Sequence, residues 1–298
     1  MQHGMYHVPV LLEEAIAGLN IIPSGTYVDC TFGGGGHSAA ILKKLSDDGK
    51  LLAFDQDADA KKNLPADKRL IFIPNNFRHL QRFMRLHKIP AVNGILADLG
   101  VSSHQFDVPE RGFSTRYNAH MDMRMNQNEN LDAAKVIATY SEERLHKIFE
   151  EYGEVTNAKT LARIIVSLRK SQSLKTINEF KTALYPIVKG NPEKYFAKVF
   201  QALRIEVNDE LGALKDLLTQ VPAILAERGR AVFITFHSLE DRIVKNFFRY
   251  GNFEEQKDES DLYGRPQQSI LKLITKKPII PSAQEIKNNP RSRSSKLR

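Results

Sequence analysis

The sequence predicts an α/β fold with a mostly parallel sheet and an inserted all-helical domain. Three observations support this prediction. Apolar strand-like runs alternate with helical spacings over the first hundred residues, helical spacing alone follows, and the alternation then resumes. Such alternation is typical of βαβ units, whose strands are apolar because helices cover both sheet faces. The predicted division is 1–105 for the first part of the sheet domain, 106–208 for the helical insertion and 209–298 for the second part.

The first part is predicted to contain four strands, each an apolar run bounded by polar residues or glycine. Helical spacing of apolar residues separates these runs. After an N-terminal helix at 10–19, strands are expected at 26–30, 51–55, 69–73 and 93–100, with helices at 37–45, 58–63 and 76–87.

The insertion and the second part follow the same reasoning. Apolar residues recur at helical spacing in four segments of the insertion, at 141–153, 156–172, 176–188 and 193–208. The second part is predicted to hold a helix at 208–225, a strand at 229–236, a helix at 239–250 and a final strand at 268–275. The polar, basic tail at 281–298 is expected to cross the surface without regular structure.

Composition restricts the class of protein. The chain has 298 residues, of which 42% are hydrophobic and 26% charged, and it has no apolar run long enough to cross a bilayer. A single cysteine, Cys30, excludes an internal disulfide and a cysteine metal cluster. The N-terminus lacks the basic and apolar regions of a signal peptide. We therefore expect a cytoplasmic protein that does not bind a membrane.

Positive charge gathers in two segments. Residues 156–204 carry ten Lys or Arg against two Glu, and residues 272–298 carry eight against one. The net charge of the whole chain is +8, so the remainder is acidic. Either segment alone can be a solvated helix face, but two of them on an acidic body favour a polyanionic partner such as nucleic acid.

The stretch VDCTFGGGGHSAAIL, residues 28–42, places four glycines between a predicted strand and a predicted helix. Glycine costs backbone entropy, so this loop must need a bare backbone. No GxxxxGK[ST] motif is present, and the glycines match a dinucleotide fingerprint only in part. A carboxylate, Asp29, ends the strand and would repel a phosphate but attract a cation. The loop therefore indicates a cationic nucleoside ligand.

Two further residues at strand ends fit a nucleoside. Asp55 ends the second strand 22 residues after Gly33, close to the spacing at which an acid binds ribose hydroxyls. Its alternative role is a helix N-cap. Phe77 follows the third strand and could lie against adenine, or pack in the core. The cationic sulfonium and ammonium groups of S-adenosylmethionine suit Asp29 and Asp98, so we favour this cofactor, with NAD as the competing interpretation.

Eight motifs follow one another along the chain: TFGGGGHS, LLAFDQD, ADLGVSSHQFD, PERGFS, DMRM, FQALRIEVNDEL, FITFHSLEDRIVK and NPRSRSSKLR. In this order they closely resemble the family of bacterial cytosine-N4 methyltransferases of small-subunit (16S) ribosomal RNA. The resemblance covers residues 7–298 and implies a Rossmann-like class I methyltransferase that uses S-adenosylmethionine. Its substrate would be a cytidine in the decoding region of the ribosomal RNA or of the assembled small subunit.

The resemblance also implies, by position, the cofactor contacts. These are Gly35, Gly36, His37, Asp55, Phe77, Asp98 and Gln105. Asp98 has two candidate roles. It could be the catalytic acceptor of a hydrogen bond from the target amine, or a purely cofactor-binding acid. The Pro-Pro-aromatic run that follows this acid in many amino-methyltransferases is absent, so a stacking aromatic must come from elsewhere, with Phe106 and Phe113 as candidates.

The motif FHSLEDRIVK places a second polar group at a strand end. His237 and Ser238 are expected to line the substrate pocket, while Glu240 and Asp241 stabilise the first turn of the following helix. Adjacent residues do not form a catalytic triad, whose members converge from separate loops. The nine histidines show no ligand spacing, so we predict no metal site. The remaining alternative function is an RNA-binding ribosome-assembly factor, and the sequence leaves the oligomeric state open, a homo-oligomer included.

Overall fold

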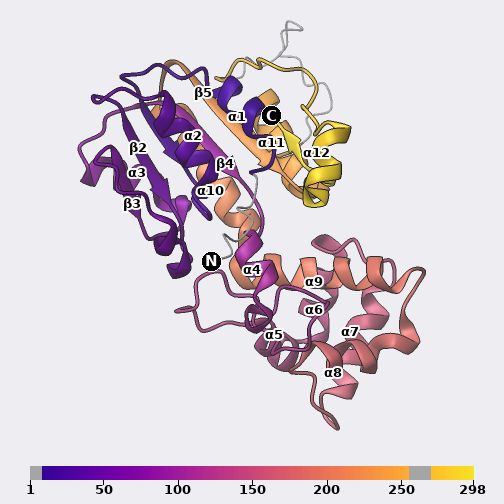
Figure 1. Cartoon of the computed structure of the whole chain (residues 1–298). Coiled ribbons are helices and arrows are strands. Elements are labelled where there is room, and N and C mark those ends of the chain that lie inside the picture. The colour runs from indigo at the N-terminus through magenta and orange to yellow at the C-terminus, as the bar shows by residue number, and fades with distance from the viewer. Residues whose placement is uncertain (1–8, 255–269) are drawn as a thin grey trace, which may run out of the picture. The chain divides into compact units, whose positions relative to one another are not determined.

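The computed structural model describes residues 9–254 and 270–298, which form two compact units (Figure 1). Unit 1 comprises the described residues of Met1–Gly100 and Leu211–Arg298. Unit 2 comprises Val101–Glu210, and the segment 106–208 lies wholly within it.

Unit 1 is built on a six-stranded sheet with the order β3-β2-β1-β4-β5-β6. The first five strands are parallel and β6 runs antiparallel to β5. This confirms the predicted α/β class with a mostly parallel sheet. The strands are β1 (Thr26–Asp29), β2 (Lys50–Phe54), β3 (Leu70–Ile73), β4 (Val92–Asp98), β5 (Leu225–Thr235) and β6 (Lys296–Leu297).

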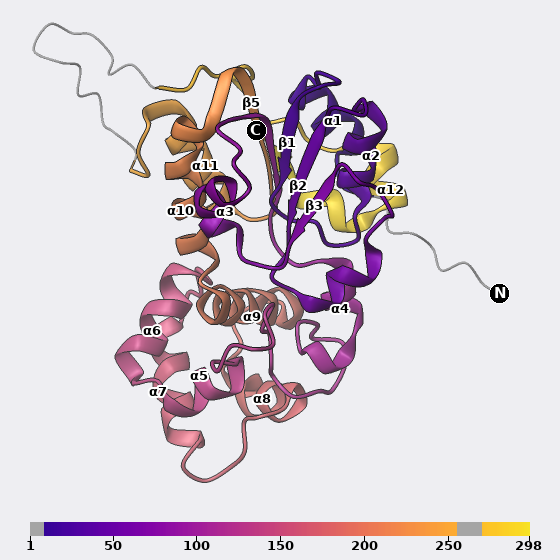
Figure 2. The same ribbon diagram turned by 90° about the vertical axis from the view of Figure 1, so that its left-hand side faces the viewer.

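Helices cover both faces of this sheet, which explains why its strands are apolar runs (Figure 2). On one face, α1 (Leu12–Leu19) and α2 (Gly36–Lys44) bury Leu19 and Ile41 in a cluster with strand residues such as Tyr27. On the other, α3 (Leu80–Leu86), α10 (Glu210–Ile224) and α11 (Ser238–Tyr250) pack in a second cluster around Phe54 and Phe233. Burial of these clusters is the main stabilising term for the unit.

The strand order creates the switch point of a doubly wound sheet. Strand β1 lies between β2 and β4, so the chain leaves the sheet in opposite directions after β1 and β4. The register aligns Asp29 with Ala53 of β2 and with Leu96 of β4, and Asp98 with Ile234 of β5. The carboxyl ends of these four strands therefore meet at one edge, where ligands bind in such sheets.

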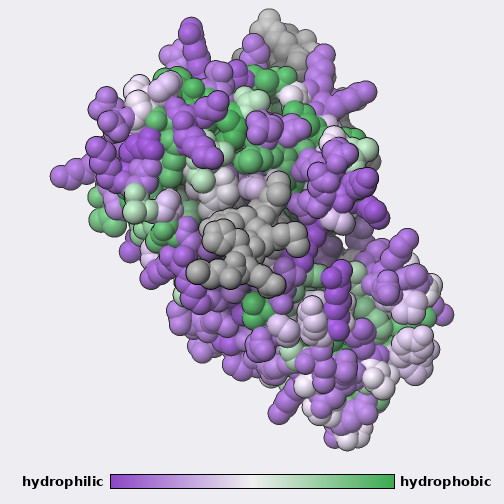
Figure 3. All heavy atoms as spheres, viewed as in Figure 1, coloured by the Kyte–Doolittle hydropathy of each residue, from purple (hydrophilic) through white to green (hydrophobic). Residues whose placement is uncertain are grey.

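Unit 2 consists of helices joined by loops around its own apolar cluster, which includes Phe149, Phe180 and Leu203. Side-chain caps begin several helices where the sequence places Ser, Thr or Asn, as Ser141 and Thr176 do. On the face shown in Figure 3, hydrophilic side chains cover most of the surface of unit 2, as expected of amphipathic helices. The helices are α4 (Ser103–Asp107), α5 (Ala133–Thr139), α6 (Glu142–Glu151), α7 (Ala158–Leu168), α8 (Ile177–Leu184) and α9 (Pro192–Asn208), and the sequence analysis missed the first two.

The predictions for the C-terminal segment were wrong. Of the strand expected at 268–275, residues 268 and 269 lie outside the described residues, and 270–275 have no strand structure. The tail expected to be irregular instead forms α12 (Ala283–Asn288) and the edge strand β6. Lys296 and Arg298 both bind the Asp241 carboxylate, so two of the tail's positive charges hold it to α11.

Among the helices of the described residues, none combines the length and apolar character that crossing a bilayer requires.

Candidate functional site

Asp55 ties the end of β2 to the glycine loop. Its Oδ2 accepts the backbone N–H of Gly33 at 2.7 Å, and its Oδ1 accepts that of Asp57 at 2.8 Å. Burial raises its pKa to about 6. The N-cap of the following 3-10 helix (Ala58–Asn63) is Asp57, which accepts from Asp59, so Asp55 does not have the capping role. Each Asp55 oxygen keeps a second lone pair, with which the carboxylate could bind a diol.

At two of the four loop glycines, a side chain would clash with other residues of the folded chain. Gly35 has φ +76°, and a Cβ there would lie 2.9 Å from the Phe32 ring. A Cβ on Gly36 would lie 2.2 Å from Cγ of Pro9. A Cβ on Gly34 would meet no described atom within 4 Å. Two of the four glycines are therefore explained by folding, while Gly34 leaves open space beside the loop.

Asp29 stabilises the glycine loop through hydrogen bonds on either side of it. It is 1% exposed, and its two oxygens accept from the backbone N–H of Thr31 and the hydroxyl of Ser38. The Thr31 hydroxyl accepts in turn from the backbone N–H of Asp98. Asp29 thus contributes its negative charge to the site, while its atoms hold the ends of β1 and β4 together.

The Asp98 side chain is 23% exposed, but the charge of its carboxyl group is poorly compensated. Its Oδ1 is buried and has no hydrogen-bond partner among the described residues, and its Oδ2 lies 3.6 Å from Nδ1 of His37. Burial, and then the nearby Asp29 and Glu240, raise the pKa of Asp98 well above its ordinary value. A cation placed here would relieve this repulsion and stabilise the ionised form, and an N–H donor would satisfy the unpartnered oxygen.

His37 lies beside the Asp98 carboxyl. It is buried in the first turn of α2, and its Nε2 lies 3.1 Å from the carbonyl oxygen of Val10. A carbonyl only accepts hydrogen bonds, so Nε2 carries the proton and Nδ1 faces Asp98.

Phe77 and Gln105 are placed differently from the residues around Asp98. Phe77 follows β3 as the first residue of a 3-10 helix, is partly buried, and packs against the core cluster around Phe54. Gln105 belongs to unit 2, where it completes a capping box with Ser102 at the start of α4 and is 4% exposed. The structure thus gives both side chains a packing or capping role, and their contact with a cofactor remains a prediction.

The end of β5 contributes a dyad that the sequence analysis did not foresee. Oε2 of Glu240 accepts the backbone N–H of Phe236 at 2.9 Å, and its Oε1 lies 3.1 Å from Nε2 of His237. Glu240 is 2% exposed, and both ring nitrogens of His237 are buried without a well-formed hydrogen bond among the described residues, so the 3.1 Å approach to Glu240 is a close contact between two ionisable groups. An acid three residues after a histidine at a strand end is the signal that could have indicated this pair.

Comparisons with known proteins identify the family of the chain. Residues 4–298 match the model of the MraW methylase family. Three similar relatives carry the name ribosomal RNA small subunit methyltransferase H. They come from Bacteroides thetaiotaomicron (53% identical), Parabacteroides distasonis (50%) and Flavobacterium johnsoniae (51%), and each alignment covers 98% of this chain and 96% of the relative.

The match extends over the glycine loop, the acids at the strand ends, the helical insertion and the basic tail. The chain therefore belongs to the MraW methylase family.

Proposed function

We propose that this chain transfers a methyl group from S-adenosylmethionine to the N4 amine of a cytidine in the decoding region of small-subunit ribosomal RNA. Membership of a methylase family supports methyl transfer, and the names of the relatives support the RNA substrate. The cytidine and its N4 atom follow from the motifs that resemble the cytosine-N4 methyltransferases. The reaction would take place in the bacterial cytoplasm, where small subunits are assembled.

The observation that carries the proposal is the state of Asp98. A carboxyl group that has one buried oxygen without a hydrogen-bond partner among the described residues, and that lies close to two other acids, is costly in the absence of a ligand. Such a group suits a cationic cofactor, an amine that donates a hydrogen bond, or both. The same site disfavours a pyrophosphate, because Asp29, Asp98 and Glu240 would repel it.

The residues present fit S-adenosylmethionine, which when bound supplies an electrophilic methyl group on a sulfonium. Asp55 would accept hydrogen bonds from the ribose hydroxyls with its remaining lone pairs. The open space beside Gly34 would admit the nucleoside, and the exposed part of Phe77 would lie against the adenine. Gly35 and Gly36 shape the loop, His37 lies beside Asp98, and Gln105 is included by its position in the family motif.

The protein's contribution to the chemistry is alignment and hydrogen bonding. The amine lone pair of cytosine is delocalised into the ring, so the amine is a weak nucleophile. A hydrogen bond from that amine to Asp98 would localise the lone pair, and fixing the amine in line with the methyl group lowers the barrier further. Because a paired cytosine hides its amine, the base must be unpaired or flipped out. His237, whose Nε2 lies 3.1 Å from Oε1 of Glu240, would contact the substrate base.

Unit 2 would hold the surrounding RNA. Lys159, Arg163 and Lys170 lie exposed on or just after α7 and can meet phosphates. Arg169 cannot serve in the same way, because its guanidinium donates to the carbonyl oxygens of Ile137 and Tyr140.

The test is transfer of labelled methyl groups to small subunits from a strain that lacks this gene, followed by mass spectrometry of the nucleosides. We expect N4-methylated cytidine in RNA from the decoding region. Tight RNA binding without methyl incorporation would instead support the assembly-factor alternative.

A further inference from the structure

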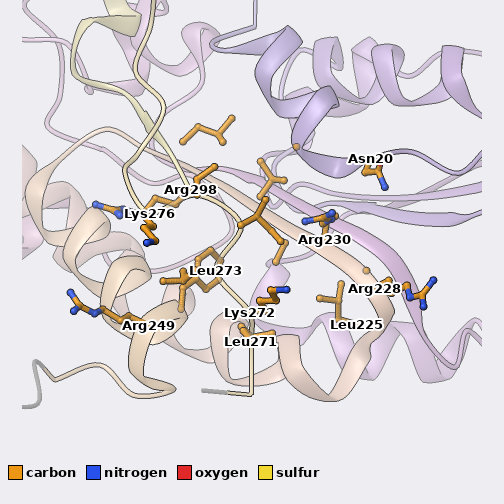
Figure 4. Close-up of a pocket in the computed structure, with 18 of the residues that line it drawn as sticks. Asn20, Leu225, Arg228, Arg230, Arg249, Leu271, Lys272, Leu273, Lys276 and Arg298 are labelled. Carbon is orange, nitrogen blue, oxygen red and sulfur yellow. The ribbon is translucent and has the colours of Figure 1, made fainter. Parts of the chain in front are cut away.

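A groove of about 1220 Å³ runs along the outer edge of β5 in unit 1 (Figure 4). Strand β6 pairs with Ile234 and Thr235 near the end of β5, and Arg298 exchanges backbone hydrogen bonds with Phe233. The earlier part of this edge has no strand partner among the described residues. The amino-terminal half of β5 forms one wall of the groove. The second half of α11, the end of α1 and residues 270–279 complete it.

The groove is strongly basic. Its lining contains eight cationic side chains and one acid, Glu227. Figure 4 shows that the cations come from several elements, with Arg228 and Arg230 on β5, Arg249 on α11, and Lys272 on the segment after residue 270. The eight are Arg228, Arg230, Lys245, Arg249, Lys272, Lys276, Lys277 and Arg298.

Half of these eight cations form no ion pair with the described residues. Arg298 is bound by Asp241. Arg228, Lys272, Lys276 and Lys277 are exposed, and no described acid forms an ion pair with them. Unpaired cations gathered along one groove create a potential that attracts a polyanion.

The backbone that carries Arg228 is strained. Between two paired positions, β5 advances from Leu225 to Arg230, five residues, while β4 advances from Val92 to Gly94, two residues. The extra residues of β5 bulge from the sheet, and Arg228 within the bulge has φ +62°. A non-glycine residue in this left-handed region costs free energy, and such strain concentrates at functional sites. The bulge places a cation at the rim of the groove.

This groove is separate from the candidate methyl-transfer site. That site lies at the carboxyl ends of the strands, whereas Arg230 lies six residues before Phe236, or about 20 Å along an extended strand. A small ligand in one place cannot occupy the other. A long polyanion could reach both.

From this we infer that the groove binds the sugar–phosphate backbone of the RNA substrate, away from the base that is methylated. The inference rests on the proposed function. Phosphate contacts of this kind set position and affinity without reading sequence. Ile270, Leu273 and Ile274 are 80%, 43% and 65% exposed beside the cations, and they can pack against sugars or unpaired bases.

The test is a triple variant, Arg228→Gln, Lys272→Gln and Lys276→Gln, which removes three exposed charges. The probe is a labelled transcript of the small-subunit decoding region, titrated over a range of salt concentrations. The slope of log affinity against log salt should fall by about 0.7–0.9 for each lost contact, and affinity at low salt should weaken roughly 10–100-fold. The matched control, Lys68→Gln, Arg82→Gln and Arg85→Gln, changes three exposed cations around β3 and α3 and should behave as the wild type.

Two further measurements separate the possible outcomes. If the wild type methylates small subunits but the triple variant matches the control in RNA affinity and salt slope, the groove inference is wrong and the proposed function stands. If the wild type transfers no methyl group to RNA, the proposed function fails whatever the groove does. The second measurement is sedimentation with phosphatidylglycerol vesicles, which tests whether the groove binds a membrane surface. Vesicle binding that the triple variant loses, with RNA binding unchanged, would assign the groove to a membrane surface and overturn the inference.

Discussion

The Asp55 carboxylate and the Gly33 backbone N–H are joined by a 2.7 Å hydrogen bond, although the residues are 22 positions apart. This bond connects the two features that the sequence singled out, the glycine loop after β1 and the acid after β2. It also means that Asp55 has two tasks, since any change to it alters the loop as well as a bound ribose. For variants of Asp55, both the ligand affinity and the free energy of unfolding must therefore be measured.

The first prediction concerns the charge of Asp55. Burial raises its pKa to about 6, so below that pH the group is protonated and loses its charge-assisted acceptor strength. Affinity for S-adenosylhomocysteine should be steady above pH 6 and weaken up to about tenfold per unit below it. Asp55→Asn should bind at least about tenfold more weakly at pH 8 and lack the break near pH 6. Calorimetry across pH measures both. Unchanged affinity in the variant would leave Asp55 only its loop contacts.

The second prediction uses two neighbouring glycines as a matched pair. Gly36→Ala should lower the free energy of unfolding by about 1–3 kcal/mol, because its methyl group would collide with Pro9. Gly34→Ala should leave the melting temperature nearly unchanged but weaken S-adenosylhomocysteine binding, since only a ligand would meet that methyl group. Thermal melts with and without the ligand distinguish the two effects. Full affinity in Gly34→Ala would show that the cofactor does not approach this part of the loop.

The third prediction separates the two roles of Asp98. If Asp98 accepts from the target amine, Asp98→Asn should retain cofactor affinity while turnover falls, by about a hundredfold or more. If it neutralises the cofactor, affinity should fall first, because the unpartnered oxygen and the charge face the ligand. Calorimetry and methyl-transfer kinetics on the same preparation decide between the roles. A variant with normal affinity and normal turnover would remove Asp98 from the site.

A fourth prediction addresses His237. Its side chain is 10% exposed and lies beside Glu240, and neither of its ring nitrogens has a hydrogen-bond partner among the described residues. His237→Ala should lower kcat/KM for small subunits roughly 10–100-fold and leave S-adenosylhomocysteine affinity unchanged, as expected for a group that contacts the base. Loss of cofactor affinity instead would move His237 to the cofactor side of the site. Circular dichroism provides the check that α11 still begins correctly.

The fifth prediction distinguishes Arg169, whose side chain is hydrogen-bonded within unit 2, from the exposed Arg163 and Lys170. Arg169→Gln should cost about 1–3 kcal/mol of stability, because its guanidinium satisfies the carbonyl oxygens of Ile137 and Tyr140 at the end of α5. Arg163→Gln with Lys170→Gln should leave stability unchanged but reduce the salt slope of RNA binding by about 0.7–0.9 per contact. Denaturant melts and RNA titrations test the two parts. A wild-type slope in the double variant would mean that α7 turns its exposed face away from RNA.

The tail shows why one part of the fold could not be read from local patterns. Residues 268–275 have the apolar, β-branched character of a strand, yet the described part of that segment is not in the sheet. The strand beside β5 is Lys296–Leu297, two residues within a polar tail. Its position depends on backbone pairing with Ile234 and Thr235 and on the bonds of Lys296 and Arg298 to Asp241. None of these contacts is local in sequence.

The sequence by itself determined the α/β class, the first five strands, the helical character of the insertion and the family. It did so because strand and helix periodicity are local, and because Asp55 and the glycine loop keep a recognisable spacing. Only the tertiary structure decided which polar groups are satisfied. Asp57 rather than Asp55 caps the short helix, Asp29 is bonded from two sides, and Asp98 is left with an unpartnered oxygen. Burial and hydrogen bonding depend on neighbours that are distant in the chain, so the charge state and the availability of a side chain are properties of the fold.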